Sequence, residues 1–435
     1  MRAREPIESR LRAAGLPALP RTAWLEVDLD RLAANLDAIR ATLSPGVRVH
    51  VVVKADAYGH GAVPVSRALE AAGADGFCTA TYDEALELRG AGIRAPIVVL
   101  YATPVEHLAE AARRGIALTV ADDVGLGRTL RAIRDLRAVG RPRRVVGLHL
   151  EVETGLGRDG LAPGEVASAA RAIRGTPGAR LDGVWSHLAA PEDRTGSTAQ
   201  ATAFSLAIGL LEEARPPVPS RHLAASGAVL AASAPQHDAV RVGLAMYGLV
   251  PDALVSDRAA RARIRALAPV ASLHATPVRV ADLPPGHGVG YGPSFVTGRP
   301  SRIATLPIGY ADGWSRGLEG ASVLVRGRAV PTVGRVSMDS VTVDVTDVPG
   351  PPVTVDDEFV LFGTQGSATR GAHLLARHRT TIVYEVVSGL GRRLTRVYHA
   401  AARIEGMRTL NGEVARWHGF RPGAATSATS RSTRS

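Results

Sequence analysis

One lysine stands out in a chain that otherwise uses arginine for its basic side chains. Lys54 is the only lysine among 52 lysine and arginine residues, and it follows three valines at 51–53. These valines predict a buried strand that ends at Lys54, and Gly59 and Gly61 predict a turn after it. A lysine amine can lose its proton and form a Schiff base, whereas a guanidinium stays protonated. We therefore interpret Lys54 as a reactive amine. The alternative, a surface lysine spared by codon bias, does not explain its place after an apolar strand.

Four further polar residues lie at or just after the ends of predicted strands: Arg158, His187, Ser226 and Arg241. Each residue also has a purely structural interpretation. His187 could be an interior histidine, Ser226 a helix N-cap, and the two arginines surface residues. In a barrel of parallel strands, however, the carboxyl ends meet at one face. Together the four residues predict an anion-binding pocket centred on Lys54.

The elements that would position these residues alternate between short apolar strands and alanine-rich helical segments. Eight strands are predicted, at 47–54, 76–80, 97–100, 116–120, 145–152, 183–187, 221–225 and 239–242. Eight strands separated mainly by helices indicate the α/β class and a TIM-like (β/α)₈ barrel. An open doubly wound sheet is the alternative, but no G-x-G-x-x-G sequence opens a helix after the first strand.

The pattern changes after about residue 262. Valine- and threonine-rich runs interrupted by Gly, Pro and Asp predict a second, mainly β domain, with a final helix from 381 towards 390. The predicted organisation is a loosely organised leader at 1–21, the barrel at 22–262, the mainly β domain at 263–403 and a tail at 404–435. The small and polar composition from residue 422 onward predicts disorder at the end of that tail.

Composition limits the functional classes. A chain of 435 residues with 46% hydrophobic residues can bury two cores, and its apolar runs are too short to span a bilayer. Cys78 is the only cysteine, which excludes an internal disulfide and fits a reducing cytoplasm. The net charge of +11 could suggest nucleic acid, but the arginines are scattered and form no familiar binding motif. We expect a cytoplasmic protein with no membrane anchor, no nucleic-acid partner and no metal site.

Residues 53–61, VKADAYGHG, resemble the pyridoxal-phosphate (PLP) lysine motif of the alanine racemases. Further matches follow in that family's order: ETGLGR (153–158), SH (186–187), RVGLAMYG (241–248), GYG (290–292), GYADG (309–313), GRVSMD (334–339) and YE (384–385). Each match is weak alone, but the ordered set is highly specific and covers about residues 22–400. The resemblance implies a PLP-dependent enzyme that interconverts L-alanine and D-alanine and supplies D-alanine for peptidoglycan.

The resemblance also implies two catalytic bases. Lys54 would hold PLP as a Schiff base and serve one face of the substrate Cα, and Tyr291 would serve the other face. A tyrosine normally titrates near pH 10, so cationic neighbours are needed to favour its anion. Arg158 and His187 are the neighbours that the resemblance suggests.

The remaining site residues follow from the same resemblance. Arg241 would face the pyridine nitrogen and, because it does not give up a proton, leave that nitrogen unprotonated. Arg158 and Met338 would bind the carboxylate of a small amino-acid substrate, and Tyr310 would narrow the entrance. The implied cofactor-binding residues are Lys54, Tyr58, His187, Ser226, Arg241, Gly243, Leu244 and Tyr384.

Tyr291 and Met338 would be contributed by the second domain of a partner subunit. The resemblance therefore implies a homodimer in which each active site is built from two chains.

The chain departs from the family pattern at four positions. Ala225 replaces Asn, Val242 replaces Pro, Glu153 replaces Asp, and Glu151 replaces a lysine that many alanine racemases carry as a carbamate. With no second lysine, this chain cannot form that carbamate. We hypothesise that Glu151 supplies the negative charge instead and orients Arg158, through a water or chloride if its shorter side chain falls short. The alternative is that Glu151 pairs with another arginine on the barrel wall.

Three other functions remain open. A racemase of another amino acid and a PLP decarboxylase of the same fold are alternatives within the enzyme class. The decarboxylase is not expected to combine Gly290-Tyr291-Gly292 with Arg241 at the pyridine nitrogen. A non-catalytic PLP-carrier protein is the alternative outside that class, but it would have a related barrel alone and no second domain.

Overall fold

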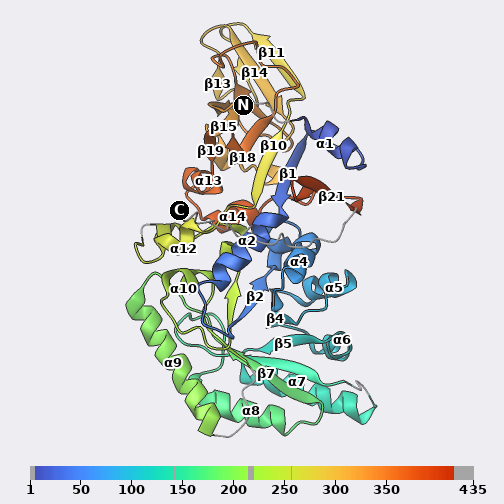
Figure 1. Ribbon diagram of the computed structural model, residues 1–435, viewed down its shortest axis with the longest axis vertical. Coiled ribbons are helices and arrows are strands. Elements are labelled where there is room, and N and C mark those ends of the chain that lie inside the picture. The colour runs from blue at the N-terminus through green and yellow to red at the C-terminus, as the bar shows by residue number, and fades with distance from the viewer. Residues whose placement is uncertain (1–4, 141–143, 214–219, 256, 416–435) are drawn as a thin grey trace, which may run out of the picture.

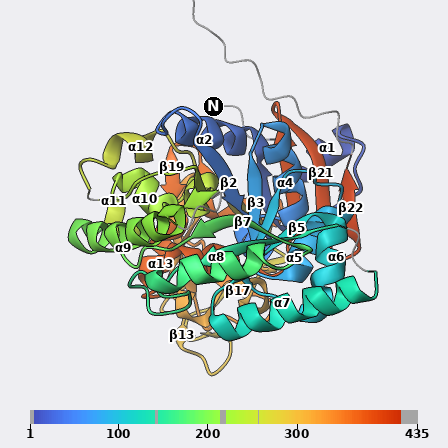
Figure 2. The same cartoon turned by 90° about the horizontal axis from the view of Figure 1, so that it is seen from below.

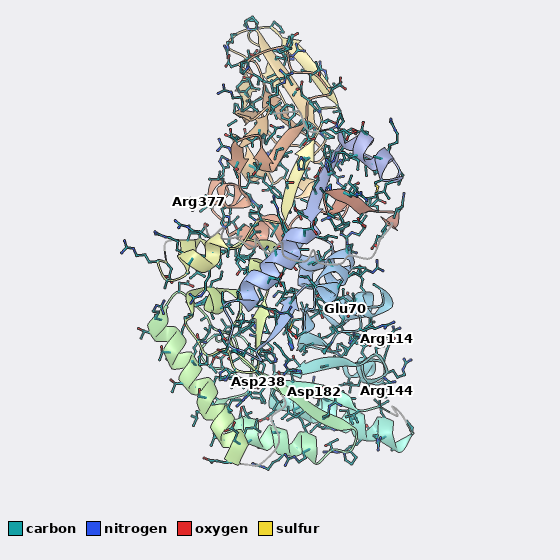
Figure 3. All side chains as sticks on the ribbon, viewed as in Figure 1. Glu70, Arg114, Arg144, Asp182, Asp238 and Arg377 are labelled. Atoms are coloured by element: carbon teal, nitrogen blue, oxygen red, sulfur yellow. The ribbon has the colours of Figure 1, made fainter. Side chains whose placement is uncertain are left out.

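The computed structural model describes residues 5–140, 144–213, 220–255 and 257–415. It contains a barrel, drawn in the lower part of Figure 1, and a mainly β domain above it. The predicted fold class is confirmed. Charged side chains of both signs lie on the barrel and at its boundary with the second domain, as the labelled residues in Figure 3 illustrate. No helix in the described ranges is long and apolar enough to cross a membrane.

Eight parallel strands form the barrel in the order β8-β7-β6-β5-β4-β3-β2-β9. An isolated parallel bridge between Ala225 and Arg241 links the two ends of this order, so the barrel is nearly closed. The strands are β2 (Arg48–Val52), β3 (Gly76–Thr79), β4 (Ile97–Ala102), β5 (Ile116–Val120), β6 (Val146–Glu151), β7 (Ala179–Trp185), β8 (Arg221–His222) and β9 (Ala239–Val242). All eight predicted strands are therefore present, although β7 begins earlier than expected and β8 is only two residues long.

Helices surround the barrel strands, as the view from below shows (Figure 2). Their starts follow local sequence signals: Asp28 and Asp122 accept the backbone N–H groups of Arg31 and Gly125 and so cap α2 and α7. The helices that follow the strands are α2 (Leu29–Arg40), α4 (Ala62–Ala71), α5 (Tyr82–Gly90), α6 (Leu108–Arg114), α7 (Asp123–Ala138), α8 (Val166–Arg174), α9 (Arg194–Glu213) and α10 (Ser226–Ala231). Two short helices, α11 (Asp252–Val255) and α12 (Arg261–Arg265), lead out of the barrel.

The second domain is built on a sheet whose main path runs β11-β14-β17-β16-β15-β18-β10-β1-β20-β21-β22, with β19 paired to β18. Its first strand is β1 (Ala23–Asp28), which pairs with β10 and β20 although it precedes the barrel in the chain. The other strands are β10 (Ala271–Ala275), β11 (Arg279–Leu283), β14 (Ser301–Leu306), β15 (Ser322–Val325), β16 (Arg328–Val333), β17 (Val341–Asp344), β18 (Phe359–Gln365), β19 (Ala368–Arg370), β20 (Thr395–Ala400), β21 (Arg403–Thr409) and β22 (Gly412–Ala415).

Smaller elements complete the second domain. Strands β12 (Gly288–Val289) and β13 (Phe295–Val296) form a separate two-stranded ribbon. Helices α13 (Ala372–His378) and α14 (Val383–Ser388) lie at its boundary with the barrel (Figure 1). The predicted final helix from 381 towards 390 corresponds to α14.

The described residues near both chain ends form helices and strands that the sequence did not predict. Helix α1 (Ile7–Ala13) lies inside the predicted loose leader, and its Ile7 and Leu11 are buried in a cluster with Trp24, Val397 and Met407. Residues 404–415, predicted to be tail, form most of β21 and β22 and extend the large sheet. These strands were missed because Ile404, Met407 and Val414 are their only large apolar residues and are too far apart to show the alternation of a strand. The predicted disorder from 422 onward lies outside the described residues.

Candidate functional site

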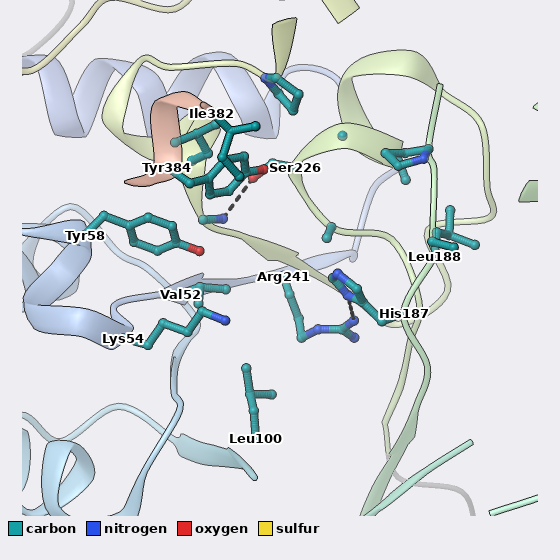
Figure 4. Close-up of a pocket in the computed structure, with 18 of the residues that line it drawn as sticks. Val52, Lys54, Tyr58, Leu100, His187, Leu188, Ser226, Arg241, Ile382 and Tyr384 are labelled. Carbon is teal, nitrogen blue, oxygen red and sulfur yellow. Dashed lines mark hydrogen bonds between the residues drawn. The ribbon is translucent and has the colours of Figure 1, made fainter. Parts of the chain in front are cut away.

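A cavity of about 640 Å³ lies at the carboxyl ends of the barrel strands, which is the face where barrel enzymes carry their active sites. Ile382 and Tyr384 of the second domain also line it (Figure 4). Nine of the twelve predicted site residues line it: Lys54, Tyr58, Arg158, His187, Ser226, Arg241, Gly243, Leu244 and Tyr384.

Lys54 follows β2 and projects its amine into this cavity (Figure 4). Burial lowers the pKa of Lys54, and the positive charge of Arg158 lowers it further. Both effects favour the neutral amine, which is the form that attacks a carbonyl carbon.

Arg241, on β9, is held rigidly at the cavity floor. Its Nη1 donates to Nδ1 and to the backbone oxygen of His222, both at 2.8 Å, and its Nη2 donates to the backbone oxygen of Ser186 at 2.6 Å. The guanidinium also lies over the Trp185 ring, 4.7 Å from its centroid. Burial lowers the pKa of Arg241 to about 10, so it is still charged at neutral pH. Its Nε has no hydrogen-bond partner within the described part of the chain, which leaves one donor for a ligand.

His187 is neutral, and the expectation of a cationic histidine beside the second base is wrong. Burial, followed by the charges of Arg241, Arg158 and Lys54, lowers the pKa of His187 to about 3. Its Nδ1 lies 3.2 Å from Nη2 of Arg241 (Figure 4). Because arginine can only donate, Nδ1 accepts and the single ring hydrogen is on Nε2. His187 is therefore a neutral donor at its other edge.

The opposite end of the cavity gathers hydrogen-bond donors. The Ser226 hydroxyl accepts from the backbone N–H of Gly243 at 2.9 Å (Figure 4), which leaves its own hydrogen free to donate. A Cβ at Gly243 would lie 2.5 Å from the Tyr58 oxygen, so only glycine fits beside this phenol. Burial raises the pKa of both Tyr58 and Tyr384, so both phenols keep their protons.

These groups fit PLP. Lys54 supplies the amine for a covalent link, the free Nε of Arg241 suits the pyridine nitrogen, and the three hydroxyl donors of Tyr58, Ser226 and Tyr384 suit a phosphate.

Glu151, at the end of β6, contacts Arg158 directly. Its Oε1 lies 3.3 Å from Nη2 of Arg158, so neither a water nor a chloride is needed to bridge them. Tyr101 covers the same guanidinium, with its ring centroid 5.5 Å from Cζ. The Glu151 side chain is only 3% exposed, and burial raises the pKa of Glu151 to about 7 although the charge of Arg158 opposes that shift. Arg158 is thus held between a carboxylate and an aromatic ring.

Three predicted residues do not line the cavity. Tyr291, Met338 and Tyr310 lie on the second domain with 74%, 52% and 42% of their surfaces exposed. The turn that carries Tyr310 is bonded to the Met338 loop, since Tyr310 N–H donates to the Ser337 carbonyl at 3.0 Å. The two loops therefore form one exposed unit, and within a single chain this unit does not meet Lys54.

Two buried histidines in the barrel interior, next to Arg241, were not predicted from the sequence. His222 and His149 are buried, and Nδ1 of His149 lies 3.1 Å from Nε2 of His222, so they extend the contacts of Arg241 through the barrel interior. A signal was present, because His149 and Glu151 are two residues apart on one strand and must share its inner face. Within the described residues, no group of three or more His, Cys, Asp or Glu could hold a metal.

Family models match the chain along both of its domains. The model of the alanine racemase N-terminal domain matches residues 27–251, and that of the C-terminal domain matches residues 270–398.

Individual relatives agree over nearly their whole length. The alanine racemase of Symbiobacterium thermophilum is 40% identical over 385 residues, covering 87% of this chain and 97% of the relative. That of Thermobifida fusca is 39% identical over 383 residues, covering 87% and 98%.

Solved structures give the same result. The alanine racemase of Bacillus anthracis, solved with bound L-Ala-P, superposes with a TM-score of 0.82 at 32% identity over 90% of this chain and 99% of that one. The alanine racemase of Bartonella henselae, solved with covalently bound pyridoxal phosphate, has a TM-score of 0.75 at 29% identity over 87% and 100%. With both domains matched in order, the chain belongs to the alanine racemase family.

Proposed function

We propose that this chain interconverts L-alanine and D-alanine with PLP as its cofactor. The observation that carries the proposal is the cavity in which the only lysine, Lys54, lies with the free Nε of Arg241 and three hydroxyl donors. The relatives named above are alanine racemases, and the Bartonella henselae structure contains covalently bound pyridoxal phosphate. The D-alanine produced would supply peptidoglycan synthesis in the cytoplasm.

PLP, when bound, would acidify the Cα–H bond of the amino acid by spreading the negative charge into its ring. Lys54 then acts as the base on one face of Cα. Its environment suits this role, because burial and Arg158 favour the neutral amine. Arg241 would hold the cofactor ring through Nε, because its Nη1 and Nη2 already donate to His222, Ser186 and His187.

Tyr291 of a second copy of the chain serves the opposite face of Cα. In one chain this tyrosine is exposed on a loop between β12 and β13, so it is available to enter another chain's cavity. There Arg158 would favour the phenolate by its charge, and the neutral His187 would donate a hydrogen bond from Nε2. The protein is accordingly a homodimer in which each site needs both chains.

Arg158 binds the substrate carboxylate, and Glu151 fixes the direction of its guanidinium. The 3.3 Å contact and the Tyr101 ring restrict Arg158 from two sides. A pre-oriented guanidinium binds a carboxylate with less loss of side-chain entropy. Met338 of the partner would complete the carboxylate site, and Tyr310 of the partner would limit the entrance to small side chains.

The test is a chiral assay of the purified protein with PLP and a panel of single enantiomers, from alanine and serine to lysine and arginine. We expect alanine to be racemised with the highest kcat/KM and in both directions. Faster racemisation of another amino acid would replace the substrate, and release of carbon dioxide without racemisation would overturn the proposed reaction.

A further inference from the structure

The residues after Lys54 adopt a conformation that their side chains disfavour. Ala55, Asp56, Ala57 and Tyr58 have φ of 52°, 56°, 53° and 53°, and none of them is glycine. They form a left-handed helical turn (α3, Lys54–Tyr58), in which Ala57 N–H donates to the Val53 carbonyl at 2.8 Å. Each such residue is unfavourable for an L-amino acid, so a run of four persists only where its surroundings hold it.

A charged clamp from the second domain holds this turn. Arg408, on β21, makes a bidentate contact with Asp56, with Nη1 donating to Oδ1 at 2.7 Å and Nη2 to Oδ2. The two side chains are only 14% and 15% exposed. Burial alone would raise the pKa of Asp56, but hydrogen bonds from Arg408 hold that pKa below its usual value. The pair is thus ionised and well shielded from solvent.

Asp56 also accepts hydrogen bonds from the residues that follow the turn. Its Oδ1 also accepts the N–H of Ala62 at 2.9 Å, at the start of α4, and its backbone oxygen accepts the N–H of Gly61 at 2.9 Å. One side chain therefore links the turn, the next helix and β21. Loss of Arg408 would leave a mostly buried carboxylate without its partner.

A second arginine of the same sheet caps the end of the turn. Arg396, on β20, is buried and donates to the Gly59 carbonyl from Nε at 3.1 Å and from Nη2 at 3.0 Å. Helix α14 also packs closely against this end of the turn, since a Cβ at Gly59 would lie 2.2 Å from the backbone oxygen of Val387. The conformation of the lysine loop is thus set by the second domain as well as by the barrel.

We propose that Arg408 is a positioning residue for Lys54: by binding Asp56 it maintains the left-handed turn and so fixes the direction of the Lys54 amine in the cavity. The inference rests on the proposed function only in taking Lys54 as the reacting amine. Arg408 lies beyond residues 270–398, the part matched by the C-terminal family model, and within the segment that the sequence predicted to be a tail. It thereby gives β21 a role in the active site.

The test compares two ion pairs that join the barrel to the same terminal strands. Arg408→Met removes the clamp and keeps the side-chain length. The matched control is Arg67→Met, because Arg67 pairs with Glu413 of β22 at 2.7 Å and does not touch the turn. Both variants are studied as PLP-loaded full chains by peptide-level hydrogen exchange over residues 54–62 and by steady-state kinetics.

In Arg408→Met we expect exchange in this peptide to rise about tenfold and kcat to fall about tenfold or more, with KM for alanine within about twofold, because a displaced catalytic group impairs chemistry more than binding. Arg67→Met should change each quantity by less than about twofold. Arg408→Lys, which keeps the charge without the bidentate fork, should recover part of the loss.

The proposal is overturned if Arg408→Met shows the same hydrogen exchange and the same kcat as the wild type. It is also overturned if Arg67→Met changes both quantities as much as Arg408→Met does, because that would indicate a general loss of stability between the two domains. If Arg408→Met does not fold, the same comparison is made with Arg408→Lys and Asp56→Asn against the control. The exchange measurement stands even if the wild-type protein prefers another amino acid, so the two proposals fail separately.

Discussion

The two regions that carry the proposed bases differ sharply in how they are built. Lys54 lies in a cavity whose floor residue, Arg241, is 2% exposed, and it is held by barrel strands, the left-handed turn and Arg408. Tyr291 is 74% exposed on a loop between two strands of two residues each. Lys54 is positioned by contacts within its own chain, whereas Tyr291 of the same chain is exposed to solvent.

This difference shows what a single chain can and cannot organise. The barrel brings residues from distant parts of the sequence together because its strand register fixes where each strand ends. The loops with Tyr291, Tyr310 and Met338 have an internal order of their own but no cavity to enter. A second copy supplies that cavity in our account, so the exposed loops and the Lys54 pocket are two halves of one site.

The largest effect is expected from removing the base on the ordered side. Lys54→Ala should lower the racemisation rate by about 10⁴-fold, because no other lysine in the chain can form the covalent link. The visible absorbance of the lysine-bound cofactor should be lost as well. Lys54→Arg is the matched control, because it keeps a long basic side chain that cannot form a Schiff base. Activity in this variant above that of Lys54→Ala would argue against a covalent role.

Removing the base on the exposed side should be less damaging and one-sided. Tyr291→Phe should lower racemisation about 10²-fold to 10³-fold while Lys54 still binds PLP, because only one face of Cα loses its base. Exchange of the substrate α-hydrogen with solvent deuterium, followed by NMR, should persist with one enantiomer and collapse with the other. An equal loss with both enantiomers would indicate that Tyr291 acts in structure or binding.

A smaller effect is expected at the carboxylate that orients Arg158. Glu151→Gln should raise KM for alanine about tenfold with little change in kcat, because the guanidinium loses its charged partner. Since burial raises the pKa of Glu151 to about 7, the wild-type KM should fall as pH rises through about 7, and this fall should be absent in Glu151→Gln. A KM and a pH profile like those of the wild type would show that the carboxylate has no part in binding.

Glu151 also makes a prediction for stability with a definite sign. A carboxyl group whose pKa is higher in the folded state than in the unfolded state contributes stability at low pH and loses that contribution as pH rises through the folded pKa. The free energy of unfolding of Glu151→Gln should therefore rise relative to that of the wild type as pH increases from about 4.5 to about 7.

Activity of the wild type should not depend on bicarbonate, because no second lysine can form a carbamate.

The smallest effect is expected at the end of the chain. Truncation before Pro422 should leave activity and Tm unchanged within error, because the removed sequence is small and polar and cannot build a core. Truncation before Arg403 should instead lower both, because it removes β21 and β22 and with them Arg408. If the shorter truncation is also damaging, the final segment contributes to the fold.

Much of this architecture could be predicted because strands that are buried on both sides leave a strong apolar signal. Residues 116–120 and 239–242 were predicted with the observed limits for that reason. The position of β1 could not be read from the sequence, since local pattern does not reveal that a strand preceding the barrel pairs with β10 and β20. Terminal strands β21 and β22 were missed because they contain few large apolar residues, and of the two only β22 is an edge strand of the sheet.

For the site, the sequence predicted which residues gather in the cavity better than it predicted their protonation states. Nine of the twelve chosen residues share one cavity, but the neutral charge of His187 follows from its burial beside Arg241, which the sequence does not show. The same holds for His222, which was overlooked because its partner Arg241 is 19 residues away. The clamp between Asp56 and Arg408 joins residues 352 positions apart, and only the packing of the two domains reveals it.

The central claim is that Lys54 of one chain and Tyr291 of another form one site, and mixing inactive chains tests it most directly. Lys54→Ala and Tyr291→Ala chains are each inactive alone and are combined in equal amounts under conditions in which mass spectrometry confirms subunit exchange. The account predicts that about a quarter of wild-type activity per chain returns, because half of the dimers are mixed and each contains one intact site. Mixed dimers that form and show no activity would contradict it.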